Sequence, residues 1–118
     1  MTATPVQKTY IMLVVADMTR ALQFYTEAFA VTVVMSSPNW SEFTAAGSTI
    51  ALHPGGSGND TVTGLGFEVK DLDTALQRAS EVGGRITRAP LERPEERIRV
   101  AELADTEGNL ITVAELLG

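Results

Sequence analysis

Two side chains of this sequence are candidates for moving a proton, and the first is His53. It is the only histidine of the chain, and it ends an apolar run directly before Pro54-Gly55-Gly56. Imidazole is the one side chain with an unperturbed pKa near neutrality, which makes His53 an acid/base candidate. A solvated or hydrogen-bonded structural histidine is the competing interpretation. The chain has no cysteine, which excludes disulfides, thiolate metal sites and a cysteine nucleophile.

The second candidate is Glu102, whose position follows from the alternation around it. In the segment Arg97-Ile98-Arg99-Val100-Ala101-Glu102, arginines alternate with isoleucine and valine. Successive side chains of a strand point to opposite faces, so if the arginines face water, Glu102 shares the apolar face. A carboxylate there would be partly desolvated and would need a hydrogen-bond donor or a ligand. The alternative is that the strand ends here and Glu102 reaches solvent.

Trp40, the only tryptophan, follows the turn Ser36-Ser37-Pro38-Asn39 at the start of a strand-like run. Its ring could stack on a flat aromatic ligand, or it could close the core or a dimer seam. Phe43 lies three positions later and therefore on the opposite strand face, so only one of the two can look toward a site. No Ser-His-Asp order, phosphate loop or dinucleotide fingerprint is present.

Composition limits the class of protein and its partners. The 118 residues, 44% of them hydrophobic, are enough for one domain with a core, residues 1–118. A net charge of -6 without a Lys/Arg cluster makes nucleic acid an unexpected partner. No apolar run is long enough to span a bilayer, and Met1 to Lys8 lacks the pattern of a signal peptide. We therefore expect no membrane association and a cytoplasmic location.

The elements that must position these residues form a repeat. Val15-Ala16-Asp17-Met18-Thr19-Arg20-Ala21-Leu22-Gln23 returns as Val69-Lys70-Asp71-Leu72-Asp73-Thr74-Ala75-Leu76-Gln77, an offset of 54 residues. In each copy a strand-like run precedes an aspartate that can cap a helix, and an apolar helical stripe follows. Three further strand-like runs complete each copy. The sequence therefore predicts an α+β fold of two β-α-β-β-β modules at about 9–53 and 61–116, joined by the glycine-rich linker 54–60.

The expected elements follow from the same patterns. Strands are expected at 9–15, 31–35, 40–45 and 49–53 in the first module, with a helix at 18–29. In the second module strands are expected at 61–69, 85–87, 98–104 and 110–116, with a helix at 72–82 and a surface loop at 89–96, which contains two prolines.

Three segments make the chain resemble the glyoxalase, bleomycin-resistance and extradiol-dioxygenase superfamily, the vicinal oxygen chelate fold. They are Leu13-Val14-Val15-Ala16-Asp17 leading to Ala21-Leu22-Gln23-Phe24-Tyr25, then Phe67-Glu68-Val69-Lys70-Asp71, then Asp105-Thr106-Glu107-Gly108-Asn109-Leu110-Ile111. The last is similar to the family's Asp-Pro-Asp-Gly-Asn turn, with Thr106 where proline is usual. The resemblance implies that the modules form a cup-shaped, partly open mixed sheet with the helices outside, and that the protein is a homodimer.

The resemblance also implies four cup-facing positions that carry histidine or glutamine, glutamate, histidine and glutamate in metal-dependent members. Counted from the motifs, these positions are Tyr10, Ala51, Leu65 and Thr112. None of the four supplies the imidazole or carboxylate that a divalent ion needs. A shift by one residue would not restore the set, because the chain contains a single histidine. We therefore expect neither a metal nor another cofactor.

Strand alternation from these positions predicts which side chains line the cup. The set is mainly apolar, which suits a ligand site, although the same side chains could fill a closed core. Its members are Tyr10, Met12, Val14, Thr49, Ala51, His53, Thr63, Leu65, Phe67, Val69, Leu110, Thr112 and Ala114.

Three functions are open at this point. The first is a metal-independent binding protein of the bleomycin-resistance type, which sequesters a drug-sized, partly aromatic molecule with His53 and Glu102 as polar anchors. The second is a cofactor-free isomerase, cyclase or lyase in which His53 or Glu102 moves a proton and Tyr10 or Thr112 stabilises an oxyanion. The third is a partner-binding module with a filled cup. The ligand-contacting residues of the first are expected to be Tyr10, Met12, Trp40, Ala51, Leu65, Phe67 and Thr112.

Overall fold

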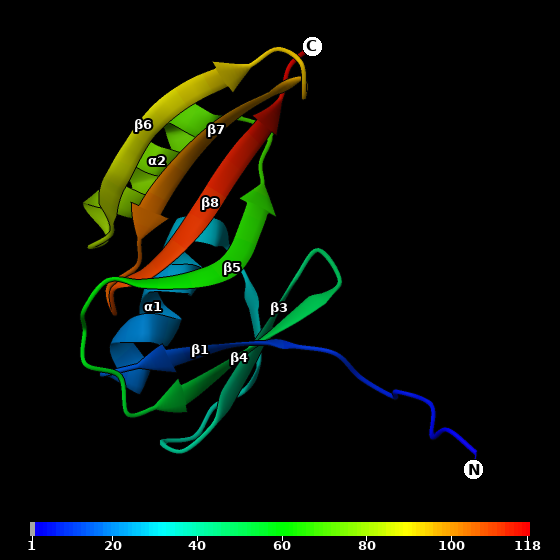
Figure 1. Ribbon diagram of the computed structural model, residues 1–118. Helices are drawn as coiled ribbons and strands as arrows, with labels where there is room; N and C mark the ends of the chain where they lie inside the picture. Colours follow the sequence, from blue (N-terminus) through cyan, green and yellow to red (C-terminus); the bar gives the residue numbers. More distant parts are fainter. Residues whose placement is uncertain (1) are drawn as a thin grey trace.

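The computed structural model describes residues 2–118 and shows two modules in chain order (Figure 1). The first contains β1 (Ile11–Val15), α1 (Met18–Phe29), β2 (Thr32–Met35), β3 (Ser41–Ala45) and β4 (Ser48–Pro54). The second contains β5 (Thr61–Glu68), α2 (Leu72–Glu81), β6 (Arg85–Arg93), β7 (Ile98–Ala104) and β8 (Asn109–Leu116). The predicted α+β fold of two β-α-β-β-β modules is confirmed.

Each module has its own four-stranded mixed sheet, and the strand order is the same in both. The orders are β1-β4-β3-β2 and β5-β8-β7-β6. The first strand of each module pairs in parallel with the last, and the other pairs are antiparallel. Within residues 2–118 the two sheets share no strand pairing, so β1 and β5 are both edge strands and no barrel closes.

Both helices begin with the same local interaction. Asp17 and Asp71 have extended backbones, with φ of -134° and -133°, directly before the first helical residue. Their Oδ1 atoms accept hydrogen bonds from the backbone N–H of Arg20 at 3.0 Å and of Thr74 at 3.1 Å. Such a cap contributes about 1 kcal/mol of helix stability. Neither helix is long and apolar enough to cross a membrane, which holds for every helix of residues 2–118.

The helices cover one face of each sheet, where the core lies. Leu13 and Val15 of β1 alternate inward, and Phe43 of β3 stacks on Tyr25 of α1 with 5.0 Å between ring centroids. Because Phe43 faces α1, it is Trp40 that lies on the other side. We call the face of each sheet away from its helix the open face. On the N-terminal sheet, strand register places Met35, Glu42, Ala51 and Met12 in one row across this face.

One predicted element differs from the structure. A short strand at 85–87 and a loop at 89–96 were expected, but β6 continues from Arg85 to Arg93. The strand passes its first proline, Pro90, because it is an edge strand and its register against β7 shifts on both sides of Arg88. Edge positions and bulges are where a strand tolerates a residue without a backbone N–H.

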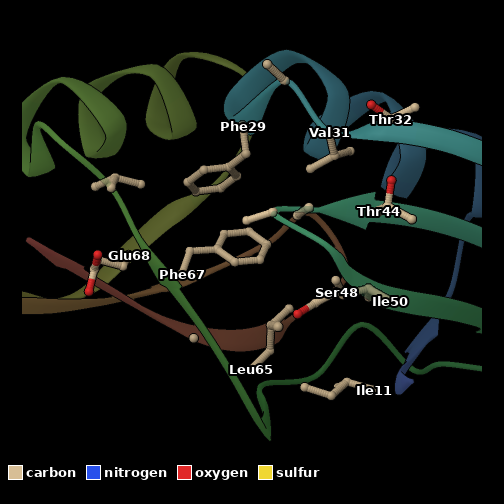
Figure 2. A pocket seen from close by; sticks show the side chains of 15 residues that line it. Ile11, Phe29, Val31, Thr32, Thr44, Ser48, Ile50, Leu65, Phe67 and Glu68 are labelled. Atoms are coloured by element: carbon tan, nitrogen blue, oxygen red, sulfur yellow. The ribbon is translucent and has the colours of Figure 1, made fainter. Parts of the chain in front are cut away.

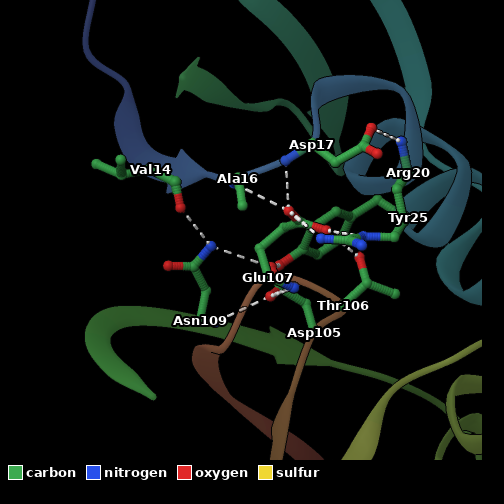
Figure 3. A network of polar contacts seen from close by, with 9 residues as sticks. All are labelled: Val14, Ala16, Asp17, Arg20, Tyr25, Asp105, Thr106, Glu107 and Asn109. Atoms are coloured by element: carbon green, nitrogen blue, oxygen red, sulfur yellow. Dashed lines mark hydrogen bonds and ion pairs between the residues drawn. The ribbon is translucent and has the colours of Figure 1, made fainter. Parts of the chain in front are cut away.

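A buried polar network joins the two modules (Figure 3). Its centre is Glu107, in the turn between β7 and β8, whose side chain has no exposed surface. Glu107 Oε1 accepts the backbone N–H of Ala16 at 3.0 Å and of Asp17 at 2.8 Å. Its Oε2 accepts Arg20 Nε at 2.8 Å and the Thr106 hydroxyl at 2.7 Å. A carboxylate of the second module thus holds the β1–α1 junction of the first.

Asp105 organises the same turn from within. Its Oδ1 accepts the backbone N–H of Glu107 at 2.8 Å and of Asn109 at 2.9 Å. Its Oδ2 accepts the hydroxyl of the fully buried Tyr25 at 2.6 Å. Asn109 Nδ2 in turn donates to the carbonyl of Val14 at 3.0 Å. The residues that resemble the family's turn therefore link both modules.

Gly108 allows the linker to pass close to this turn. Its φ is 84°, and a Cβ built on it would overlap the backbone of Gly58 and Asn59. Only glycine combines this conformation with so close an approach. The linker 54–60 is therefore packed against the inter-module network.

The two carboxyl groups of the network respond to burial differently. Burial raises the pKa of Asp105 above its ordinary value, although hydrogen bonds from Tyr25 and Asn109 oppose the effect. Burial also acts to raise the pKa of Glu107, but the hydrogen bonds from Arg20, Thr106 and the Asp17 N–H outweigh it, and that pKa lies below 4.5. Burial and the nearby Asp105 raise the pKa of Tyr25 well above 10.0, which keeps the phenol protonated as a donor.

Replacing Glu107 by glutamine should lower the free energy of unfolding by about 2 kcal/mol, because an amide NH₂ would face donors where an oxygen now accepts them. Urea unfolding of the wild type and of Glu107→Gln measures the difference. Glu81→Gln, at an exposed carboxylate at the end of α2, is the control and should change stability by less than about 0.5 kcal/mol. Equal stability of the two variants would contradict a stabilising role for the network.

The stability difference between wild type and Glu107→Gln should also depend on pH. A carboxylate whose pKa is lower in the folded state contributes fully above its unfolded value, near 4.5, and loses the contribution as pH falls through the folded pKa. We expect a constant difference near neutral pH and a smaller one in acid. Asp105 is present in both proteins, so its own titration cancels to first order. A difference that grows on acidification would contradict this assignment.

Candidate functional site

The open face of the N-terminal sheet brings several of the predicted site residues together. Met12 and Ala51 are register partners, and His53 is the partner of Val14. The ring centroid of Trp40 lies 5.7 Å from that of Tyr10 and 6.2 Å from that of His53. Tyr10, Met12, Trp40, Ala51 and His53 therefore share one surface.

This surface combines exposed walls with a small, buried floor. Tyr10 is 52% exposed and Met12 is 47% exposed, whereas Ala51 is fully buried. The Tyr10 and Trp40 rings are nearly perpendicular, at 89°, so they form an edge-to-face corner. Apolar area is thus available to a ligand without any movement of the core.

Glu42 was not among the predicted site residues, yet it lies at the centre of this face. The residue is only 8% exposed. Its Oε1 accepts Lys8 Nζ at 2.6 Å, and its Oε2 accepts Trp40 Nε1 at 2.7 Å. The hydrogen bonds from Lys8 and Trp40 lower the pKa of Glu42, although burial acts against them. The signal was available in the sequence, because Trp40 and Glu42 are two positions apart and so share a strand face.

His53 is exposed and its ring is oriented by the backbone. Its Nδ1 lies 2.6 Å from the carbonyl oxygen of Pro54. A carbonyl can only accept, so Nδ1 carries the hydrogen and donates. Nε2 is therefore the ring nitrogen left for a ligand.

The open face of the C-terminal sheet carries Glu102 and Thr112, which are register partners on β7 and β8. Glu102 is partly buried, and it finds the donor that its position required. The Thr87 hydroxyl donates to its Oε1 at 2.8 Å, and Arg88 Nε lies 3.8 Å from the same oxygen. A cavity of about 140 Å³ lies beside Glu102 and Thr112, which is small for a drug-sized molecule.

The arginines next to Glu102 were expected to face water, but one of them, Arg99, forms an ion pair within the protein. Arg99 makes a bidentate ion pair with Asp73 in the first turn of α2, with nitrogen–oxygen distances of 3.1 and 2.9 Å. Its strand face is therefore the helix face, and Glu102 lies on the other. The hydrogen bonds of this ion pair raise the pKa of Arg99.

Leu65 and Phe67 were expected to line the cup, and this placement is wrong. Leu65 is 4% exposed within the core, and the Phe67 ring lies 4.9 Å from the Phe29 ring of α1. Gly66, five residues before Asp71, is the register partner of Thr112, whereas Leu65, six residues before Asp71, lies on the other strand face. Counting from the capping aspartate therefore gave β5 the wrong parity.

Leu65 and Phe67 instead line a crevice between the modules, with a volume of about 540 Å³ (Figure 2). Its other apolar walls include Phe29, Val31 and Ile50, and its rim carries polar groups such as Ser48. The volume is within the range of small-molecule sites. The crevice is thus a second candidate cavity, separate from the N-terminal open face.

The predicted site residues accordingly fall into three groups: the N-terminal open face, the crevice, and the C-terminal open face. Within residues 2–118, no hydrogen bond, ion pair or ring contact connects the first group to Glu102 or Thr112. Both open faces remain accessible in the single chain, as the exposure of Met12 and Leu91 indicates.

The side chains at the four counted metal positions do not fit a divalent ion. They are a phenol, a methyl group, a buried leucine and a hydroxyl, and the neighbours of Leu65 on the other strand face are glycines. No group of three or more His, Asp or Glu that could hold a metal ion occurs in residues 2–118. A divalent ion needs several such ligands at once.

Comparison with solved structures shows where the same fold occurs. A glyoxalase/bleomycin resistance protein/dioxygenase family enzyme from Burkholderia phytofirmans PsJN is 20% identical, with a TM-score of 0.76 over 92% of this chain and 97% of that one. The fosfomycin resistance protein FosX from Listeria monocytogenes is 19% identical, with a TM-score of 0.77 over 95% and 94%. TioX from Micromonospora sp. ML1 is 17% identical, with a TM-score of 0.74 over 95% and 100%. At these identities the likeness shows the fold alone.

A search of curated proteins found no significant match. The family model for the Glyoxalase/Bleomycin resistance protein/Dioxygenase superfamily, in contrast, matches residues 9–113, which include both modules and the network between them. The protein therefore belongs to the Glyoxalase/Bleomycin resistance protein/Dioxygenase superfamily.

Proposed function

We propose that the protein binds a small, partly aromatic molecule without a metal, on the open face of its N-terminal sheet. The observation that carries the proposal is the contrast between the two faces of this sheet. One is filled by the core, whereas the other leaves Tyr10 and Met12 about half exposed over a buried floor. Exposed apolar area with a few polar anchors is typical of ligand sites. Resistance proteins occur among the structural neighbours, which makes a drug-like ligand the natural class to test.

Each residue of this face has a role in the proposed binding. Trp40 and Tyr10 provide ring surface for stacking, and Met12 adapts to the shape of the ligand. The small side chain of Ala51 leaves room for the ligand between them. Glu42 and His53 Nε2 supply polar contacts that fix the orientation. Sequestration needs no more than these contacts.

A cofactor-free enzyme is the second candidate, and the geometry of His53 supports it. The hydrogen bond from Nδ1 to the Pro54 carbonyl orients the ring, which leaves Nε2 as the ring nitrogen that could exchange a proton with a ligand. Glu102 suits this role less, because Thr87 and Arg88 already engage its carboxylate.

We also propose that the protein is a homodimer. β1 and β5 are apolar edge strands, and exposed apolar side chains include Val62 at 83%, Leu91 at 60% and Leu116 at 59%. Unpaired edges and exposed apolar area favour association with a second copy. In such a dimer, a C-terminal open face would complete the site of the other copy.

Ligand binding can be followed through Trp40, because it is the only tryptophan of the chain. A screen of aromatic natural products should yield compounds that change its fluorescence. For such a compound, Trp40→Leu should weaken binding about tenfold in calorimetry, since a lost aromatic contact is worth about 1 kcal/mol or more. Ser48→Phe, which narrows the crevice, should leave the affinity unchanged. The opposite pattern would place the ligand in the crevice.

The same compound separates binding from catalysis. Mass spectrometry after incubation should recover it unchanged if the protein only sequesters it. If the wild type converts the compound, and His53→Gln binds it with unchanged affinity but no longer converts it, the protein is an enzyme for that compound.

The proposed dimer can be tested by measuring the mass of the protein in solution. Light scattering should give twice the 12.6 kDa mass of one chain. Val14→Lys places a charge on the open face of edge strand β1 and should shift the protein toward monomer. Gln77→Lys, on the exposed surface of α2, is the control and should stay dimeric. A monomeric wild type would refute the dimer.

A further inference from the structure

The N-terminal arm, residues 2–10, brings an ammonium group to the N-terminal open face. Lys8 Nζ lies 2.6 Å from Glu42 Oε1, and the Lys8 side chain is 53% exposed while that of Glu42 is 11% exposed. The arm otherwise touches this face through the Tyr10 ring, and its Val6 is 79% exposed. In Figure 1 the arm runs away from the body of the protein. A charge contact at Lys8 and a ring contact at Tyr10 thus join the arm to this face.

Glu42 has no cationic partner on its own sheet. Its register neighbours are Met35 on β2 and Ala51 on β4. A nearly buried carboxylate is costly unless its oxygens are paired. Trp40 Nε1 satisfies Oε2 from within the sheet, whereas Oε1 depends on the exposed Lys8 of the arm. Glu42 Oε1 is therefore available to a cationic group that does not belong to the sheet, either Lys8 or a ligand.

The rings around Glu42 suit an organic ammonium. A charge-assisted hydrogen bond to a carboxylate and the faces of nearby aromatic rings both favour a cation. The Trp40 ring contacts the rings of both Tyr10 and His53. Ala51, the register partner of Glu42, has a small side chain and therefore leaves space next to the carboxylate. The net charge of -6 adds no long-range repulsion to a cationic ligand.

We propose that Glu42 anchors a protonated amine of the ligand, and that Lys8 holds the place of this amine in the free protein. The inference rests on the proposed function and names its ligand class: an aromatic or apolar molecule that bears an ammonium group. Binding exchanges one ammonium for another at Glu42 and releases the Lys8 side chain, while the Tyr10 ring stays on the face. No covalent bond changes.

One quantitative consequence is that Lys8 competes with the ligand. The carboxylate is free only in the fraction of molecules in which the Lys8 ammonium has left Glu42, and the apparent affinity falls by that fraction. Removing the Lys8 ammonium should therefore tighten the binding of an amine. It should leave the binding of a neutral molecule nearly unchanged.

The test uses 2-naphthylmethylamine and its neutral counterpart 2-naphthylmethanol, with affinities from isothermal titration calorimetry at pH 7. Lys8→Met should bind the amine about fivefold or more tightly than the wild type, and the alcohol within about twofold. Lys70→Met is the matched control, because Lys70 is the only other lysine and its removal changes the net charge equally. It should behave as the wild type.

Glu42→Gln completes the experiment. This variant should bind amine and alcohol alike, because the amide cannot form the ion pair. The Trp40 indole N–H resonance checks that the face is intact, since Trp40 Nε1 donates to Glu42 Oε2. The same resonance should shift when the amine is added to Lys8→Met. His53 and Tyr10 are the other titratable groups of this face, so pH is held constant.

Two outcomes would overturn the proposal: equal amine affinity in the wild type and in Lys8→Met, or undiminished amine preference in Glu42→Gln. The alcohol reports on the proposed function separately. If the alcohol binds, and Lys8→Met binds the amine no more tightly than the alcohol, only the amine anchor is refuted. If neither probe binds the wild type or Lys8→Met, the amine anchor is refuted and the open face loses its support as an aromatic site.

Discussion

The carboxylate of Glu107 is the interaction on which the arrangement of the two modules depends. It is fully buried, and it accepts two backbone N–H groups at the point where β1 passes into α1. Within residues 2–118 these two N–H groups make no other backbone hydrogen bond, so the carboxylate satisfies both donors. Arg20 neutralises the charge from the first turn of the same helix. The position of the N-terminal sheet, and with it the open face, is therefore set by a residue of the C-terminal module.

The repeat carried enough information to predict the fold and part of the site. Its two aspartates cap the helices as expected, and alternation along β1 and β4 correctly placed Met12, Ala51 and His53 on one face. Prediction failed at Leu65 because it lies an even number of residues before its capping aspartate, whereas Met12 and Gly66, which belong to the open faces, lie an odd number before theirs. Glu42 was overlooked although it shares a strand face with Trp40, and its ion-pair partner Lys8, which is 34 positions away, could not be inferred from the sequence.

The two open faces show how far a duplicated backbone can diverge in chemistry. Strand order and cap geometry are shared by both modules. On the C-terminal face, however, the acid Glu102 is held by a threonine and an arginine of the neighbouring strand. On the N-terminal face, Glu42 depends on a residue outside the sheet. The backbone repeat therefore determines on which face each side chain lies. Function depends on which polar side chains have no partner within their own sheet and can bind a ligand instead.

The turn that links the modules occurs in only one half of the duplication. Between β3 and β4 the corresponding segment is Ala45-Ala46-Gly47-Ser48, which has no acid. The second half keeps the internal hydrogen bonds of its own turn, from Asp105 to the N–H groups of Glu107 and Asn109, whether or not the first is present. The first half, in isolation, would lose the acceptor for Ala16 and Asp17 and the partner of Tyr25. The two halves are thus unequal as folding units: they share strand order and cap geometry, but the dependence between them runs mainly in one direction.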